Sequence, residues 1–210
     1  VLLLDVTPLS LGIETMGGLM DVLIPRNSKI PSKAGRQYTT QKDGQSGIRI
    51  SVFQGERDLV QDNRKLAEFV LSGIPAMPAG LPKIDIQFVI NADGILQVKA
   101  KELRTGIAQE IEVKPQYGLT DSEVEAMLLA SITHAKADIQ LRALVEASTE
   151  AAQMIQLTEN FLAKHNQYIT TEEQEATAIG LEALRKAIEQ KDKDAIMLAT
   201  EQLNQISSPY

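Results

Sequence analysis

The sequence predicts an α+β fold in which a β-sandwich is followed by an α-helical bundle. Seven of the eight prolines and eleven of the thirteen glycines lie before residue 116. Apolar and polar residues alternate in that first part, as in half-buried strands. After it, apolar residues recur every three or four positions, as on one face of a helix. The charge changes at the same point, because residues 1–115 carry 14 basic and 13 acidic side chains and residues 116–210 carry 7 and 15.

The first part contains short apolar segments separated by turn residues. Val1–Leu4 begin the chain and are compatible with either a short edge strand or an exposed docking linker. Gly17 and Gly18 separate two further strand candidates, and Asn91–Gly94 predict a tight hairpin turn. The segments with clear alternation are residues 48–52, 84–90, 96–100 and, at lower contrast, 107–113. We therefore predict about eight strands, mostly antiparallel, packed as a sandwich.

The second part has helix-start signals. Thr120 and Glu123 form a capping box, so a long helix is expected from about residue 121, with a bend between residues 135 and 138. A polar segment over residues 165–171 ends it. Thr171 with Gln174 is expected to cap the next helix, and Asp192 or Asp194 the last one. These helices are expected to form a bundle.

Composition excludes several classes of protein. The chain has no cysteine, which excludes disulfides and thiolate metal ligands and fits a reducing, cytoplasmic location. No apolar stretch approaches the roughly 20 residues that span a bilayer. The net charge is −7, and the first part lacks a dense basic stripe, which argues against nucleic-acid binding.

The sequence offers little for catalysis. It contains no glycine-rich phosphate-binding motif. His134 and Asp138 are four positions apart on a predicted helix and are the one candidate for a base with its orienting acid, but such pairs usually stabilise a solvated face. His165 has no partner at metal-ligand spacing. We expect neither a catalytic site nor a metal site.

Several motifs resemble the DnaK-type heat-shock chaperones in their linker and peptide-binding region. These motifs are Leu2–Asp5, Thr7–Gly12, Gln54–Arg57, Asp62–Asn63, Gly73–Ile74 and Asn91–Ile95. The resemblance implies an interdomain linker over residues 1–10, a substrate-binding β-sandwich over 11–115 and an α-helical lid over 116–210. It also implies that extended apolar peptides bind in a channel between strands.

The resemblance further implies a set of site residues. Those expected to contact the peptide are Ile13, Thr15, Met16, Tyr38, Thr39, Gln41, Gln45, Ile48, Ile50 and Ile84, with Met16 and Gln41 meeting above it as an arch. Without the resemblance, the alternation of residues such as Ile48 would indicate ordinary core. A lid latch is implied between Arg57 and Asp138. The residues implied to communicate with a nucleotide-binding domain are Leu2, Leu3, Leu4, Asp5, Arg26 and Asn27.

Other segments are more similar to HscA, the chaperone of iron–sulfur cluster assembly, than to general DnaK. They are residues 60–64, 71–80, 114–123 and 150–152. This resemblance implies an IscU-type scaffold as client and an HscB-type J-protein as co-chaperone; a general DnaK-type folding chaperone is the alternative. Gln41 departs from the pattern, since this arch residue is often apolar or aromatic. ATP and Mg²⁺ are expected in a separate N-terminal domain, so this chain by itself is not expected to be an enzyme. The apolar linker is also expected to allow self-association, by entering the channel of a second copy.

Overall fold

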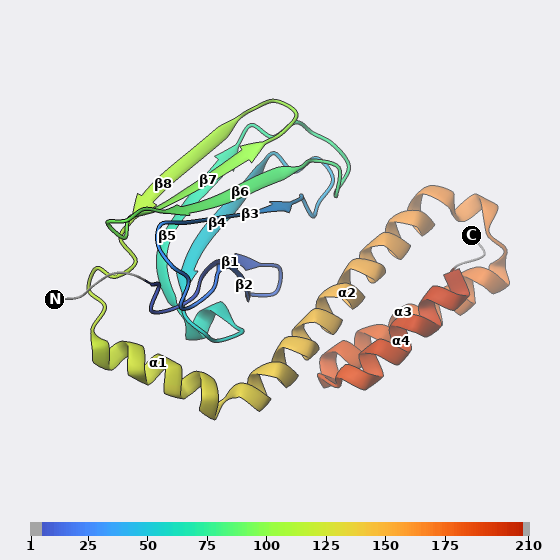
Figure 1. The fold of residues 1–210 in the computed structure, drawn as a ribbon. Coiled ribbons are helices and arrows are strands. Elements are labelled where there is room, and N and C mark those ends of the chain that lie inside the picture. Colours follow the sequence, from blue (N-terminus) through green and yellow to red (C-terminus); the bar gives the residue numbers. More distant parts are fainter. Residues whose placement is uncertain (1–5, 208–210) are drawn as a thin grey trace. The chain divides into compact units, whose positions relative to one another are not determined.

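Within residues 6–207, which the computed structural model describes, eight strands precede four α-helices (Figure 1). The predicted α+β class is therefore confirmed. The chain divides into two compact units, Val1–Lys136 and Ala137–Tyr210. The strands are β1 (Leu11–Thr15), β2 (Leu19–Ile24), β3 (Ser32–Tyr38), β4 (Gly47–Gln54), β5 (Arg64–Ser72), β6 (Ile84–Ile90), β7 (Leu96–Glu102) and β8 (Ala108–Val113).

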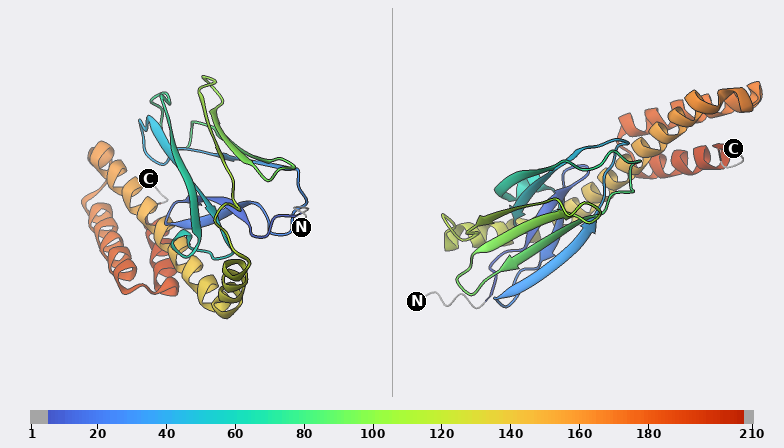
Figure 2. Two further views of the ribbon diagram at one scale, coloured as in Figure 1. Left: turned by 90° about the vertical axis from the view of Figure 1, so that its left-hand side faces the viewer. Right: turned by 90° about the horizontal axis from the view of Figure 1, so that it is seen from above.

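The strands form two four-stranded sheets, ordered β2-β1-β4-β5 and β3-β6-β7-β8, in which neighbouring strands pair antiparallel. The sheets lie face to face, as the turned views in Figure 2 show. One apolar cluster between the sheets contains side chains from both, including Val52 of β4 and Phe88 of β6. The predicted sandwich is thus confirmed, and each sheet covers the apolar face of the other.

Alternation in the sequence corresponds to burial in β6. Ile84, Ile86, Phe88 and Ile90 are buried and the residues between them are not. Strand β4 differs, because Ser51 and Phe53 are buried as well as Ile50 and Val52. Phe53 packs on the other side of its sheet in a small cluster with Met20 and Val60, so both faces of this central strand are covered.

The predicted hairpin turn between β6 and β7 is confirmed. The Asn91 Oδ1 atom accepts hydrogen bonds from the backbone N–H groups of Asp93 (2.9 Å) and Ile95 (3.0 Å). Gly94 has φ +79°, a left-handed conformation that glycine adopts without steric cost. An asparagine followed by Asp-Gly is therefore the local reason for the reversal.

The first two helices agree closely with the sequence. Helix α1 (Asp121–Thr133) begins with the predicted capping box between Thr120 and Glu123. It ends at Thr133, with His134 as its C-cap one residue before the predicted bend, and α2 (Ala135–His165) follows at once. The predicted long, bent helix is thus two consecutive helices.

The cap of helix α3 (Thr171–Gln190) corrects a prediction. Thr170 and Glu173 form the capping box, so the expected pair of Thr171 and Gln174 was wrong by one residue. Two adjacent threonines each have an acceptor three residues later, and Thr170 is the one with extended backbone (ψ 159°). Helix α4 (Lys193–Ser207) begins after Asp192, whose Oδ1 atom accepts from the N–H of Asp194 at 3.1 Å.

The second unit has its own apolar core. Leu181 and Leu184 of α3 pack with Ile196 and Leu203 of α4, and Ala151 contributes from α2. Among the described helices, none is both long enough and apolar enough to cross a membrane.

Candidate functional site

One end of the sandwich contains the loop in which three predicted peptide-contacting residues lie, namely Thr39, Gln41 and Gln45. The β3–β4 loop, residues 39–46, is joined to the β5–β6 loop, residues 73–83, by several hydrogen bonds. The Gly44 N–H donates to the Met77 carbonyl (2.9 Å), and the Ala79 N–H donates to Asp43 Oδ1 (2.8 Å). The Gly80 N–H donates to the Thr40 carbonyl at 3.0 Å. The two loops therefore support each other.

Gln45, one of the predicted residues, organises its own loop. Its Oε1 atom accepts from the backbone N–H groups of Gln41 (3.1 Å) and Lys42 (3.3 Å), and its Nε2 donates to the Gly47 carbonyl (2.8 Å). The Thr39 hydroxyl donates to the Pro82 carbonyl at 2.6 Å, while the Gln41 side chain is exposed. Gln45 and Thr39 thus shape the loop that presents Gln41.

Five of the six predicted residues that lie on strands belong to one apolar cluster. Ile13, Ile50 and Ile84 are 4%, 1% and 0% exposed, so they are part of the sandwich core. Ile48 and Tyr38 are half-buried and pack against that core. Three of these five side chains are therefore fully buried in the sandwich core, and two are partly accessible. Their contact with a peptide stays a prediction.

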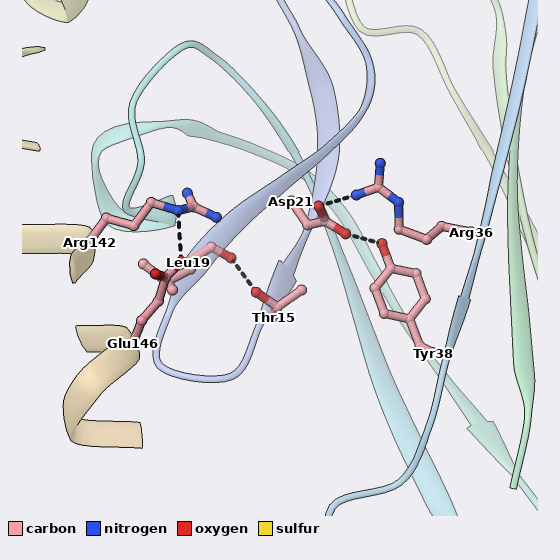
Figure 3. A network of polar contacts seen from close by, with 7 residues as sticks. All are labelled: Thr15, Leu19, Asp21, Arg36, Tyr38, Arg142 and Glu146. Atoms are coloured by element: carbon pink, nitrogen blue, oxygen red, sulfur yellow. Dashed lines mark hydrogen bonds and ion pairs between the residues drawn. The ribbon is translucent and has the colours of Figure 1, made fainter. Parts of the chain in front are cut away.

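Thr15 and Met16 lie where β1 turns into β2. The Thr15 hydroxyl donates to the Leu19 carbonyl at 3.3 Å and closes this turn (Figure 3). Met16 is half-buried. The arch predicted between Met16 and Gln41 stays a prediction.

Asp21 and Arg36 lie beside this cluster and contact the predicted residue Tyr38, but the sequence analysis did not identify them. Asp21 of β2 pairs with Arg36 of β3 and accepts a hydrogen bond from the Tyr38 hydroxyl (Figure 3). Burial raises the pKa of Tyr38, and the hydrogen bond to Asp21 raises it further. The hydrogen bond that Arg36 itself donates to Asp21 raises the pKa of Arg36. An acid inside the apolar strand Leu19–Ile24, and an Arg two positions before a Tyr, were the available signals.

Arg26 and Asn27, two of the residues predicted to communicate with a second domain, lie at the opposite end of the sandwich from the β3–β4 loop. The Asn27 N–H donates to the Thr7 carbonyl (2.8 Å), and the Arg26 N–H donates to the Ser10 hydroxyl (2.9 Å). Ser10 is held in turn by the Glu56 carboxylate. Arg26 and Asn27 are therefore fixed beside the described part of the predicted linker. Leu2, Leu3, Leu4 and Asp5 lie outside the described residues.

The predicted latch residues belong to different units. Arg57 follows β4, and its Nη2 atom lies 3.6 Å from Asp62 Oδ2. Asp138 lies in the first turn of α2. The latch between them stays a prediction.

The helical unit has a hollow that contains none of the predicted residues. It measures about 360 Å³ and is lined mainly by α2, including Met154, Leu157 and Phe161. Among the described residues, no cluster of His, Cys, Asp or Glu is arranged to hold a metal ion. The His165 ring instead lies 5.0 Å from the Phe161 ring, centroid to centroid.

Comparison with known families covers the whole chain. The family model described as Hsp70 protein matches residues 1–210. The chain belongs to the Hsp70 family. The resemblance to heat-shock chaperones that the sequence motifs indicated is therefore confirmed.

Curated relatives point to one branch of that family. The chain is 46% identical over 209 residues to a chaperone protein HscA homolog of Methylococcus capsulatus, which covers 100% of this chain and 34% of that protein. It is 47% identical to chaperone protein HscA of Klebsiella pneumoniae over 204 residues (97% of this chain, 33% of the relative). For HscA of Xenorhabdus nematophila the identity is 47% over 210 residues (100% and 34%). The chain thus spans about a third of the length of these HscA relatives.

Proposed function

We propose that this chain is the substrate-binding region of an ATP-dependent, HscA-like chaperone and that it captures extended apolar peptide segments. Residues 1–10 would act as the linker, 11–115 as the peptide-binding sandwich and 116–210 as the lid. In this proposal the chain itself catalyses no reaction. ATP and Mg²⁺ would act in a nucleotide-binding domain outside this chain, and no residue here is assigned to them. Membership of the Hsp70 family supports this division of labour.

The observation that carries the proposal is the apolar cluster of the sandwich, in which buried and half-buried predicted residues pack together. Tyr38 and Ile48 are half-buried, and they pack against the core that contains the buried Ile13, Ile50 and Ile84. In our proposal the half-buried pair contacts the peptide and the three buried residues form the floor of the pocket. The hydrogen-bonded loop containing Thr39, Gln41 and Gln45 would lie beside the peptide, and Thr15 and Met16 would approach it from the β1–β2 turn.

Affinity for such a peptide should be moderate. Burial of one or two aliphatic side chains contributes about 1.5–3 kcal/mol each. Ordering of the peptide and loss of its translational freedom oppose this gain. Backbone hydrogen bonds to an extended peptide add affinity for any sequence, while the pocket selects side chains. We therefore expect dissociation constants in the micromolar range.

The identity of the client is the finer part of the proposal. The relatives are named HscA, and for this chain we propose a proline-containing loop of an IscU-type scaffold as client, presented by an HscB-type J-protein, in the cytoplasm. Arg26 and Asn27, held beside Thr7, would relay the nucleotide state from the linker leucines and Asp5. Arg57 and Asp138 would hold the lid closed.

Titration of two labelled peptides tests the proposal. One contains Leu-Pro-Pro and the other is rich in leucine without proline, and binding is followed by fluorescence anisotropy. Ile48→Asp should weaken binding at least about tenfold, since a charge would occupy an apolar pocket. Val70→Asp is the matched control, because Val70 lies on the neighbouring strand and is 52% exposed. Circular dichroism establishes that both variants are folded.

The outcomes separate the two chaperone classes. Preference for the Leu-Pro-Pro peptide supports the HscA-like assignment, whereas equal affinity for both peptides supports a general DnaK-type chaperone. Absence of binding of either peptide to the unmodified chain at millimolar concentration would refute peptide capture. Equal weakening by Ile48→Asp and Val70→Asp would place the site elsewhere.

A further inference from the structure

The side chain of Asp21 connects the two sheets of the sandwich. Asp21 lies on β2, at the edge of one sheet, and Arg36 and Tyr38 lie on β3, at the edge of the other. One carboxylate oxygen of Asp21 pairs with Arg36 and the other accepts the Tyr38 hydroxyl (Figure 3). Arg36 and Tyr38 are two positions apart, so both side chains are on the same side of β3 and reach one acid.

The bond between Asp21 and Tyr38 is better protected than a surface ion pair. The Asp21 side chain is only 23% exposed, and the Tyr38 ring packs against the apolar core. Burial raises the pKa of Tyr38, so its hydroxyl stays protonated and donates over the whole neutral range. Hydrogen bonds to a charged acceptor are roughly twice as strong as neutral ones. The link is therefore a stable connection between the two edge strands.

The link lies between two residues of the proposed pocket. In the β1–β2 pairing Asp21 is directly opposite Ile13, and in the β3–β6 pairing Tyr38 is directly opposite Ile84. Ile13 and Ile84 form part of the proposed floor, one from each sheet. A change in the separation of β2 and β3 would therefore change the distance between the two sides of that floor.

We propose that Asp21 and Tyr38 are positioning residues that fix the width of the peptide pocket and thereby make it select aliphatic over aromatic side chains. This inference rests on the proposed function. A leucine-sized side chain enters without moving the edge strands. A phenylalanine-sized one requires them to separate, which breaks the bond between the carboxylate and the hydroxyl. The Tyr38 ring, held at its hydroxyl, cannot rotate aside to make room.

The decisive variant is Tyr38→Phe, which removes the hydroxyl and keeps the ring. Two peptides that are identical except for a central Leu or Phe are titrated against each form of the chain. For the unmodified chain we expect tighter binding of the Leu peptide. The measured quantity is the dissociation constant of the Phe peptide divided by that of the Leu peptide. In Tyr38→Phe this ratio should fall about tenfold, as loss of one charge-assisted hydrogen bond implies. Gln37→Ala, on the same strand with an exposed side chain, should leave the ratio unchanged.

A second variant tests whether the two residues act as one unit. Asp21→Asn keeps an acceptor but loses the charge, so it should lower the ratio less than Tyr38→Phe does. The double variant should resemble Tyr38→Phe alone, because the bond can be lost only once. Thermal melts of each variant separate a change in selectivity from a change in stability.

The failures of this inference and of the proposed function are distinguishable. If the unmodified chain binds neither peptide, the proposed function fails, and the pocket-width inference with it. If it binds both and the ratio is the same in Tyr38→Phe, only the width inference is overturned. An equal fall of the ratio in Gln37→Ala would also overturn it, since the effect would then not depend on the bond.

Discussion

The sandwich and the helical unit bury their apolar side chains in different ways. The sandwich core consists largely of isoleucine, leucine and valine from both sheets, together with the fully buried Phe88. The helical core alternates large side chains, such as Leu184, Ile196 and Leu203, with the small Ala151, Ala187 and Ala199. Strand layers are held about 10 Å apart and need bulky side chains to fill the space. Helices with alanine at their contacts can approach more closely.

This difference predicts where each unit tolerates a larger side chain. In the sandwich, backbone lies against backbone within each sheet and cannot shift locally. In the helical unit, the two atoms nearest to a Cβ at Gly180 of α3 are the ends of the Leu203 and Ile206 side chains of α4, which can move. Because the two units have separate apolar cores, we expect separate unfolding transitions, and the variants below should affect one transition at a time.

The largest contrast is expected between two glycines. A Cβ atom at Gly12 of β1 would lie 2.0 Å from the backbone carbonyl oxygen of Asp21, and no side-chain movement relieves that overlap. Gly12→Ala should lower the free energy of unfolding of the sandwich by more than about 4 kcal/mol, or prevent its folding. The free energy of unfolding of the sandwich is measured in urea, with hydrogen exchange of the β1 and β2 amides as the probe. A loss below 1 kcal/mol would contradict the rigid-backbone argument.

Gly180→Ala in α3 is the matched case in the helical unit. The new Cβ would meet Leu203 Cδ1 at 3.1 Å and Ile206 Cδ1 at 3.4 Å, and both are mobile ends of side chains. Alanine also gains up to about 1 kcal/mol of helix propensity over glycine. We expect the free energy of unfolding of the helical unit to change by less than about 1 kcal/mol. Gly180→Val, with two further methyl groups, should cost clearly more.

The second prediction concerns the two cores. Phe88→Ala should cost about 3–5 kcal/mol and Leu184→Ala about 2–5 kcal/mol, because both side chains are fully buried. Calorimetry should show Phe88→Ala lowering only the sandwich transition and Leu184→Ala only the helical one. A shift of both transitions by either variant would mean that the two units unfold together.

The contrast also explains what could be predicted from the sequence. Strand alternation over residues 84–90 and the Asp-Gly turn predict the hairpin because both signals are local. The break at His134 was missed by one residue, since neither proline nor glycine marks it. The cap of α3 was wrong because adjacent threonines offer equal signals and only backbone geometry distinguishes them.

The candidate site was predictable to the level of residue types and family motifs. Alternation over residues 48–52 and 84–90 predicted buried faces that include Ile50 and Ile84, and their burial agrees with that prediction. Ile13 was assigned to the peptide channel by the family resemblance alone, and that assignment stays a prediction. The partnership of Asp21 with Tyr38 could not be predicted, because β2 and β3 belong to different sheets and their side chains meet only after the sandwich has formed. Pairing across sheets leaves no periodic trace in a single sequence.

A smaller loss of stability is expected when either capping box loses its threonine hydroxyl. Thr170→Ala removes a hydroxyl that accepts from the Glu173 N–H at 3.2 Å and should destabilise the helical unit by about 1 kcal/mol. Thr120→Ala removes the same bond, also 3.2 Å, from α1, a helix without fully buried residues. It should cause local fraying, measured by hydrogen exchange at residues 121–124, and leave the sandwich transition in place. If Thr120→Ala lowered the sandwich transition as much as Thr170→Ala lowers the helical transition, α1 would contribute to the sandwich core.

The smallest expected effect is the pH dependence introduced by Glu102. Its Oε2 atom accepts from the Thr105 hydroxyl (2.6 Å) and N–H (2.7 Å), and its Oε1 from the Arg104 N–H (2.9 Å). The Thr105 hydroxyl and these N–H groups hold the pKa of Glu102 below the ordinary value of 4.5. Because the folded pKa is lower than the unfolded one, the contribution to stability is complete above the unfolded pKa. It is lost as the pH falls through the folded pKa.

Thr105→Val removes the hydroxyl and keeps the N–H, so the pKa of Glu102 should rise toward 4.5. Carboxyl NMR titration of Glu102 measures that rise directly. Melts above and below pH 4.5 should show a weaker acid sensitivity of the sandwich transition in Thr105→Val than in the unmodified chain. The helical transition should respond to pH identically in both chains, because the change is confined to the β7–β8 turn. An unchanged pKa of Glu102 would mean that the backbone N–H groups alone hold the carboxylate.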